Sequence, residues 1–308
     1  MVRGLQAELR MLHDYPTSAT CGTRRMNNDT AYLESLYNNR AAVPDFQAYF
    51  DRWADKSEIT RRAMQDRFEK DVPYGDDIME TMDVFLPKGE SKALLMFVHG
   101  GYWRSLDKAQ HAFVAAPFVD AGVAVASINY SLCPAVSMEH IVKQMIAAAV
   151  FLYRNASDFD IPRRRMYVAG HSAGGHLAAM ALACLWPQAS PGLPRTVFQG
   201  ALSISGLYDL RVLTSVPSIN DDLRMTPESA IRLSPALMEP PTNAPLCIAV
   251  GGQEIGGFKD QHRIIAQAWP GNIGADIPCP EDHHFSILEK FADGKSELFR
   301  ASMQFMGL

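Results

Sequence analysis

Short apolar runs alternate with longer amphipathic segments along most of the chain, and turn residues separate them. The apolar runs rich in β-forming side chains predict strands at residues 82–86, 93–98, 123–128, 166–169, 197–204, 245–250 and 275–278. Segments with helical spacing predict helices at residues 108–121, 138–154, 177–186, 259–269 and 291–306. Because parallel neighbours need helical crossovers, this order predicts an α/β domain with a mostly parallel, doubly wound sheet and helices on both faces.

Three segments depart from this simple alternation. The strands at residues 82–86 and 93–98 are joined by a short turn, so we expect them to be adjacent, with the antiparallel exception at the start of the sheet. Residues 207–240 are irregular and rich in Pro, Ser and Asp, which predicts an insertion of short helices above the sheet. Residues 81–308 would then form one domain, preceded by a partly helical N-terminal extension at residues 1–80.

The clearest feature of the N-terminal extension is an amphipathic helix that starts after Pro44. Its aromatic side chains follow the i, i+3, i+4, i+7 spacing of one helix face: Phe46, Tyr49, Phe50 and Trp53. Such a stripe is typical of core packing. The alternative is that the extension covers the mouth of an active site.

Charge and cysteine content narrow the range of partners and compartments. The 308 residues carry a net charge of -5 and form no basic stripe, so we expect a small-molecule substrate, no nucleic acid and no membrane partner. The sequence does not decide whether the chain forms a homo-oligomer. The cysteines are odd in number and lack metal-site spacing, which predicts reduced core residues: Cys21, Cys133, Cys184, Cys247 and Cys279. Without an apolar stretch of signal-peptide or membrane-spanning length, a cytoplasmic location is expected.

Candidate chemistry centres on the run Gly170-His171-Ser172-Ala173-Gly174, which follows a predicted strand and leads into an apolar helix. The pattern G-x-S-x-G also arises by chance at ordinary turns, but this context is typical of a nucleophile elbow. The two glycines are needed because the strained serine turn leaves no room for neighbouring Cβ atoms. The turn exposes the Ser172 hydroxyl, which makes acyl transfer the leading hypothesis.

A second motif, His99-Gly100-Gly101-Tyr102-Trp103, follows the strand at residues 93–98 and strengthens that hypothesis. The carboxyl ends of parallel strands meet at one edge of a sheet, where α/β proteins place their ligands. The backbone N–H groups of Gly100, Gly101 and Ala173 are therefore the expected oxyanion hole. We expect His99 to hold this loop by hydrogen bonds.

A serine nucleophile needs a base, and the base needs an orienting acid, in the chain order Ser, acid, His. Two histidines follow the last predicted strand, and we favour His284 over His283 because it directly precedes an apolar residue and a helix start. Glu254, in the loop after the penultimate strand, is favoured as the acid. Asp209 and Asp260 remain alternatives for that role.

The remaining candidate residues surround these motifs. His171 and His176 flank the nucleophile, but their spacing suits no usual metal site, so we expect both to be structural. We expect no metal and no cofactor. Four aromatic residues line a pocket for an aryl group or pack in the core, and the sequence leaves both roles open: Tyr102, Trp103, Tyr208 and Phe258.

Together the motifs resemble the serine-dependent kynurenine formamidases, or arylformamidases, and their bacterial α/β-hydrolase relatives. The resemblance spans nearly the whole chain: Tyr37-Asn38-Asn39-Arg40, His99 to Arg104, Gly170 to Leu177, Ser205 to Leu210 and His284-Phe285-Ser286. It implies an α/β-hydrolase fold, a catalytic domain at residues 81–308 and a triad of Ser172, Glu254 and His284. It also implies hydrolysis of N-formyl-L-kynurenine to L-kynurenine and formate, a step of tryptophan degradation.

The chain departs from that family beside the acid. Members often have Asp where Glu254 stands, and here residues 255–258 read Ile-Gly-Gly-Phe in place of a Ser-x-Glu-Phe-like run. Relatives with the same motifs include carboxylesterases, amidases and carbamate hydrolases. Three hypotheses follow: an arylformamidase, a carboxylesterase or aryl-amide or carbamate hydrolase for small acyl substrates, and a hydrolase-fold binding protein without catalysis. The intact nucleophile, base and acid favour an enzyme.

Overall fold

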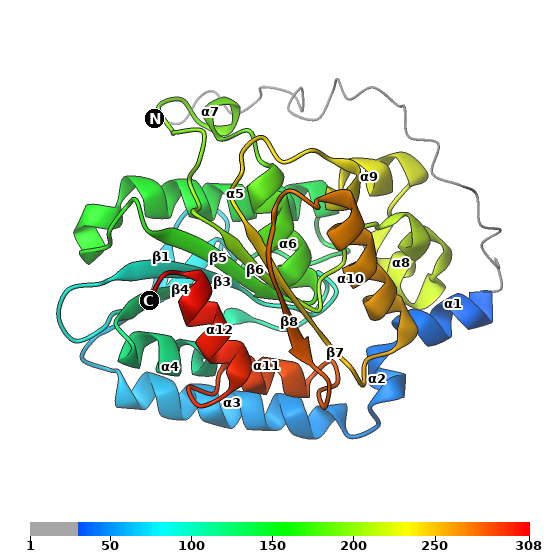
Figure 1. Cartoon of the computed structure of the whole chain (residues 1–308), viewed down its shortest axis with the longest axis horizontal. Helices are drawn as coiled ribbons and strands as arrows, with labels where there is room; N and C mark the ends of the chain where they lie inside the picture. Colours follow the sequence, from blue (N-terminus) through cyan, green and yellow to red (C-terminus); the bar gives the residue numbers. More distant parts are fainter. Residues whose placement is uncertain (1–29) are drawn as a thin grey trace.

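A computed structural model describes residues 30–308 and has one eight-stranded sheet, in the order β1-β2-β4-β3-β5-β6-β7-β8 (Figure 1). The strands are β1 (Phe68–Pro73), β2 (Thr81–Phe85), β3 (Ala93–Val98), β4 (Val123–Ile128), β5 (Met166–His171), β6 (Ala201–Ile204), β7 (Leu246–Gly251) and β8 (Ile273–Cys279). Strand β2 is antiparallel to β1 and β4, and the pairs from β4 to β8 are parallel. The predicted sheet, with its antiparallel exception at the start, is confirmed.

Two features of the sheet differ from the prediction. Strands β2 and β3 are not adjacent, because β4 lies between them and pairs with both. Strand β1 was not predicted from the pattern of apolar residues. It is an edge strand whose side chains are mostly exposed, so burial imposes no clear alternation on its sequence.

Helices cover both faces of the sheet (Figure 1). One face carries α5 (Met138–Arg154), α6 (Ala173–Ala183) and α10 (Gly256–Ala268), and the other carries α3 (Phe46–Ala63), α4 (Ala115–Asp120), α11 (Ser286–Phe291) and α12 (Glu297–Phe305). The side chains of β3 alternate between the two layers. Leu94 and Met96 enter the core beneath the first group, whereas Leu95 and Phe97 enter the core beneath the second.

Two predicted helices are shorter or divided. The segment at residues 108–121 begins with 3₁₀ turns at Lys108–Gln110 and Ala112–Val114, and α4 starts only at residue 115. That start places Pro117 in the first helical turn, where its missing N–H costs no hydrogen bond. The segment at residues 291–306 is broken because Ser296 caps a new helix, its Oγ accepting from the N–H of Phe299 at 2.9 Å.

The predicted insertion and the N-terminal helices lie at the carboxyl edge of the sheet. The insertion contains α8 (Pro217–Leu223) and α9 (Pro227–Arg232), with 3₁₀ turns at Arg211–Ser215 and Pro235–Leu237, and a short α7 (Trp186–Ala189) follows α6. Helix α1 (Thr30–Tyr37) contacts α8 and α10, and α2 (Asn39–Ala42) leads from it toward α3. These segments surround the strand ends that carry the predicted catalytic residues.

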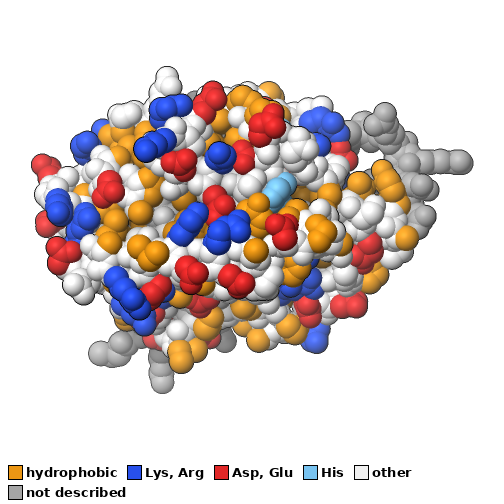
Figure 2. All heavy atoms as spheres, turned by 90° about the horizontal axis from the view of Figure 1, so that it is seen from below, with side chains coloured by type: hydrophobic (Ala, Val, Ile, Leu, Met, Phe, Trp, Pro, Cys, Tyr) orange, Lys and Arg blue, Asp and Glu red, His pale blue; other side chains and the backbone are white. Residues whose placement is uncertain are grey.

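The outer face of α3 has a mixed charge pattern (Figure 2). Arg52 and Lys56 on α3 both pair with Glu289 of α11, at 3.4 and 2.9 Å. Among the helices of residues 30–308, none combines the length and apolar character that crossing a bilayer requires. The cysteines within this part of the chain are buried and unpaired, as predicted, and Cys21 lies outside the described residues.

Candidate active site

The turn between β5 and α6 holds Ser172 at an uncommon positive φ of 58°, with ψ at -118°. Its neighbours must lack side chains. A methyl group on Gly170 would lie 2.1 Å from the carbonyl oxygen of Gly174, and one on Gly174 would lie 1.9 Å from the carbonyl oxygen of Val98. Ala173 is the first residue of α6, so its N–H has no acceptor within the helix.

Three side chains from separate strand ends meet at this turn. Ser172 Oγ lies 3.0 Å from His284 Nε2, and His284 Nδ1 lies 2.7 Å from Glu254 Oε2. An ionised carboxylate only accepts hydrogen bonds, so Nδ1 donates to Glu254 and Nε2 accepts from the serine hydroxyl. All three side chains are buried. The arrangement can activate a nucleophile, move its proton and stabilise the resulting imidazolium.

The second carboxylate oxygen of Glu254 is also fixed. Its Oε1 accepts from Ser205 Oγ at 2.5 Å and from the backbone N–H of Gly251 at 2.8 Å. These two donors at the ends of β6 and β7 orient the carboxylate toward His284. Sequence reasoning included Ser205 only in a family motif and gave it no role, because its contact with Glu254 joins residues far apart in the chain.

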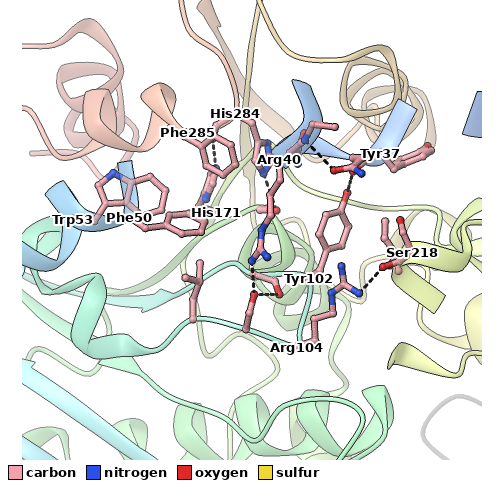
Figure 3. A pocket seen from close by; sticks show the side chains of 18 residues that line it. Tyr37, Arg40, Phe50, Trp53, Tyr102, Arg104, His171, Ser218, His284 and Phe285 are labelled. Atoms are coloured by element: carbon pink, nitrogen blue, oxygen red, sulfur yellow. Dashed lines mark hydrogen bonds between the residues drawn. The ribbon is translucent and has the colours of Figure 1, made fainter. Parts of the chain in front are cut away.

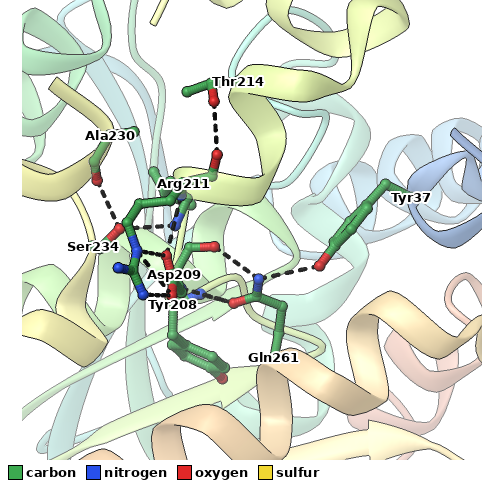
Figure 4. A network of polar contacts seen from close by, with 9 residues as sticks. Tyr37, Tyr208, Asp209, Arg211, Thr214, Ala230, Ser234 and Gln261 are labelled. Carbon is green, nitrogen blue, oxygen red and sulfur yellow. Dashed lines mark hydrogen bonds and ion pairs between the residues drawn. The ribbon is translucent and has the colours of Figure 1, made fainter. Parts of the chain in front are cut away.

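The alternative acids lie in other contacts. The Asp209 carboxylate pairs with Arg211 at 2.6 Å (Figure 4). The backbone N–H of Asp209 donates to Gln261 Oε1 at 2.8 Å. Gln261 Nε2 also reaches the hydroxyl of Tyr37 at 3.3 Å, so this network joins the insertion to α10 and α1. Asp260 pairs with Arg263 on the same helix. Neither carboxylate contacts His284.

The alternative base is likewise held elsewhere. His283 Nε2 lies 2.9 Å from the hydroxyl of Tyr49 on α3, and its Nδ1 faces the backbone N–H of Phe285 at 3.2 Å. The structure therefore brings His284, and not His283, to Ser172.

The loop that follows β3 lies directly against the serine. A methyl group on Gly100 would come within 3.1 Å of Ser172 Cβ, and Gly101 has a φ of 107° that favours glycine. Gly100 thus lies against Ser172, the residue before Ala173 in the chain, and Gly101 follows Gly100 and lines the same cavity as Ser172. This close approach supports the prediction that the N–H groups of Gly100, Gly101 and Ala173 stabilise an oxyanion.

His99 holds this loop from behind, as predicted. Its ring stacks on Tyr130 with centroids 4.3 Å apart, its Nε2 lies 3.2 Å from Asn129 Oδ1, and its Nδ1 lies 2.8 Å from the carbonyl oxygen of Gly100. Burial lowers the pKa of His99, which favours the uncharged ring.

A cavity of about 430 Å³ opens over Ser172 and His284 (Figure 3). Its volume suits a small molecule. Phe285, Phe50 and Trp53 lie on one side of it, and Tyr102 lies on the other. The remaining lining residues are Tyr37, Asn38, Asn39, Arg40, Ala41, Gly101, Arg104, Ser105, Leu106, His171, Ser218 and Ile219.

Of the four aromatic residues considered for substrate binding, only Tyr102 lines this cavity. Trp103 is fully buried against the ring of His176, and Tyr208 is buried with its hydroxyl 2.7 Å from Ser203 Oγ. Phe258 packs behind His284, with ring centroids 4.4 Å apart. For these three side chains, proposed for substrate binding with core packing as the open alternative, the structure shows core packing outside the cavity lining.

The N-terminal helices supply lining residues to which sequence reasoning gave no binding role. Arg40 and its neighbours were noted only as part of a family resemblance, since a short polar segment gives no periodic signal. The aromatic stripe of α3 serves both predicted purposes: Phe50 and Trp53 are buried in a core, and they also form part of the cavity wall.

The two histidines beside the nucleophile make structural hydrogen bonds, as predicted. His171 Nε2 lies 2.8 Å from the carbonyl oxygen of His284, and its ring also borders the cavity. His176 Nε2 lies 2.7 Å from the carbonyl oxygen of Leu233. Within residues 30–308, no group of His, Cys, Asp and Glu side chains is arranged to hold a metal ion.

Buried His176 should make the folded state sensitive to acid. Desolvation lowers its pKa from 6.5 to about 4, so the unfolded chain binds a proton between these values while the folded chain does not. Stability should therefore fall as the pH drops through this window, by about 3 kcal/mol from this residue. We expect urea unfolding of His176→Gln to show a shallower loss between pH 6.5 and 4 than the parent. Equal slopes would contradict this assignment.

Comparison with known proteins identifies the family of this chain. The family model BD-FAE matches residues 82–185. The kynurenine formamidase of Danio rerio is 33% identical over 289 residues, covering 90% of this chain and 94% of that protein. The kynurenine formamidase of Salmo salar is 33% identical over 246 residues, covering 77% of this chain and 81% of that protein. The crystal structure of a candidate thioesterase from Silicibacter sp. TM1040 has a TM-score of 0.78 and 34% identity, covering 87% of this chain and 97% of that chain.

The mostly parallel sheet, the serine turn and these relatives define a hydrolase of the α/β-hydrolase fold. The identity to the two kynurenine formamidases extends over most of this chain and most of each relative, which narrows the assignment from a fold to a family. The chain belongs to the kynurenine formamidase family.

Proposed function

We propose that this enzyme hydrolyses aryl formamides, N-formyl-L-kynurenine or a close analogue, through a formyl-enzyme intermediate on Ser172. The names of the family members support the substrate class. One observation carries the mechanism. Ser172, His284 and Glu254 form an unbroken hydrogen-bonded series, with distances of 3.0 and 2.7 Å, at the base of a cavity of small-molecule size.

In the first half of the reaction, Ser172 Oγ bonds to the formyl carbon while His284 Nε2 takes the hydroxyl proton. Glu254 stabilises the imidazolium that results. The carbonyl electron pair moves to the oxygen, which accepts from the backbone N–H groups of Gly100, Gly101 and Ala173. When the tetrahedral intermediate collapses, His284 gives its proton to the aryl nitrogen, the C–N bond breaks and the amine leaves.

In the second half, water replaces the amine beside His284. The imidazole takes a proton from the water as its oxygen bonds to the formyl carbon. Collapse of the second intermediate breaks the bond to Ser172 Oγ, which regains its proton from His284. Formate leaves, and the enzyme returns to its starting state.

The test is turnover of N-formyl-L-kynurenine beside p-nitrophenyl acetate on the same preparation. We expect a kcat/KM for the formamide above about 10⁴ M⁻¹ s⁻¹, within the usual range for enzymes acting on their own substrates. Kynurenine absorbance and an independent assay of formate should rise in equal amounts. If the ester is hydrolysed and the formamide is not, the formamidase proposal fails.

A carboxylesterase acting on small acyl esters is the second candidate. The Silicibacter relative is described as a candidate thioesterase, and the same three side chains can attack an ester or thioester carbonyl. An ester leaving group depends less on proton donation by His284 than an aryl amine does. The rate comparison above therefore separates the two candidates.

We also propose that the enzyme acts in the cytoplasm. The unpaired, buried cysteines in the described part of the chain support a reducing compartment. Burial raises the pKa of the Cys184 and Cys247 thiols to about 12, which keeps them protonated and unreactive.

A further inference from the structure

The cavity wall carries two arginines and, within residues 30–308, no carboxylate. Arg104 is neutralised by Asp222, with its Nη1 2.7 Å from Asp222 Oδ2. Arg40 forms no ion pair in the described part of the chain, and its Nη2 donates to Ser105 Oγ at 3.3 Å. Arg40 is therefore the uncompensated positive charge of the described cavity wall.

The Arg40 side chain is held across the cavity. Its guanidinium lies 5.4 Å from the ring centroid of Phe46 and 5.7 Å from that of Phe50, which are favourable cation–π distances. Figure 3 shows the side chain extending from α2 past His284 toward the loop after β3. A guanidinium has five N–H donors in a planar fork, which matches the two oxygens of a carboxylate.

The position of Arg40 relative to the reacting atoms determines which part of a substrate it can bind. Ser105, the hydrogen-bond partner of Arg40, donates from its Oγ to the carbonyl oxygen of Gly101 at 3.0 Å. Arg40 is thus two hydrogen bonds away from the predicted oxyanion loop. A formyl group has no atoms to carry a charge, so an anionic group near Arg40 must belong to the amine half of the substrate.

Charge around Arg40 also favours an anion. Partial burial and the nearby Arg104 guanidinium lower the pKa of Arg40. A substrate carboxylate beside α2 would offset the repulsion between the Arg40 and Arg104 guanidinium groups. It would not have to displace an existing ion pair of Arg40. Because Arg40 is exposed where it lines the cavity, such an anion could reach it directly from solvent.

We propose that Arg40 binds a carboxylate on the leaving-group half of the substrate, so that the enzyme selects anionic aryl formamides over neutral ones. This inference rests on the proposed formamidase function and adds a specificity-determining residue to it.

The test compares two substrates of nearly equal shape, one anionic and one neutral: 4-(2-formamidophenyl)-4-oxobutanoate and its primary amide. For the parent enzyme we expect kcat/KM to favour the acid by about 10- to 100-fold, as for other hydrogen bonds to charged groups. Arg40→Gln should remove this preference by slowing the acid alone, mainly through KM. Arg40→Lys should keep part of it, since a lysine retains the charge but not the fork.

Two matched variants separate the alternatives. Arg52 lies on the outer face of α3 and pairs with Glu289 of α11. The Arg52→Gln enzyme should therefore show the same preference as the parent. If Arg40→Gln keeps the preference for the acid, or if Arg104→Gln alone removes it, the assignment to Arg40 is overturned. If the parent hydrolyses both formamides equally, the carboxylate proposal fails while the formamidase function stands. If it hydrolyses neither, both fail together.

Discussion

Replacing Ser172 with alanine should reduce kcat by about 10⁶-fold, the loss measured when the nucleophile of a serine hydrolase is removed. The Ser172 hydroxyl supplies the atom that bonds to the acyl carbon, and no other hydroxyl is hydrogen-bonded to His284 Nε2 in the described chain. The measurement is single-turnover and steady-state hydrolysis of N-formyl-L-kynurenine and p-nitrophenyl acetate. Both activities should disappear together.

The same variant supplies its own control for folding. Alanine removes one hydrogen bond at the turn and leaves its glycine neighbours in place, so the Ser172→Ala protein should unfold near the parent's Tm. A folded variant with parental turnover would exclude Ser172 as the nucleophile. Loss of one activity but not the other would mean that two separate sites had been measured.

Replacing Glu254 with glutamine should reduce kcat by about 10⁴-fold, the scale seen when the acid of a triad becomes an amide. The carboxylate accepts from three donors: Ser205 Oγ, the backbone N–H of Gly251 and His284 Nδ1. A glutamine has only one oxygen. If its NH₂ faces His284, the ring must carry its proton on Nε2 and can no longer accept from Ser172; if its NH₂ faces Gly251, two buried donors oppose each other.

Asp209→Asn is the matched control for this prediction. Asp209 follows β6 and is the other acid that sequence reasoning retained there, but its carboxylate pairs with Arg211. We expect parental kcat from Asp209→Asn and a deep loss from Glu254→Gln under identical conditions. The reverse result would assign the orienting acid to Asp209.

The parts of the fold that were predicted correctly are those that local sequence dictates. Helix α5 and strand β4 have the bounds expected from residues 138–154 and 123–128, because long apolar runs with clear periodicity can be buried in few ways. The elbow could be proposed for a similar reason. Its two glycines are required because a Cβ atom at either position would collide with neighbouring backbone, and both lie within two residues of Ser172. The local sequence is therefore enough to single out Ser172.

The parts that were missed depend on distant segments meeting. No local signal places β4 between β2 and β3, and the exposed edge strand β1 has little apolar alternation. Arg40 reaches Ser105, 65 residues away in the chain, and nothing in the sequence near either residue marks that contact. Trp103 is a different case: an aromatic residue beside a motif suits a pocket or a core equally, and its burial against His176 depends on segments distant in the chain.

The contact between α3 and the histidine loop has a consequence for how new specificities could arise in this family. Tyr49 bonds to His283 at 2.9 Å, and Phe46 and Phe50 pack their rings against Phe285, so the N-terminal segment supports the catalytic loop while its neighbouring residues line the cavity. Substrate choice and catalytic geometry are therefore not independent modules. Grafting a foreign N-terminal segment would have to preserve the aromatic stripe together with Arg40, whose guanidinium lies over Phe46 and Phe50 and donates to Ser105 in the loop after β3.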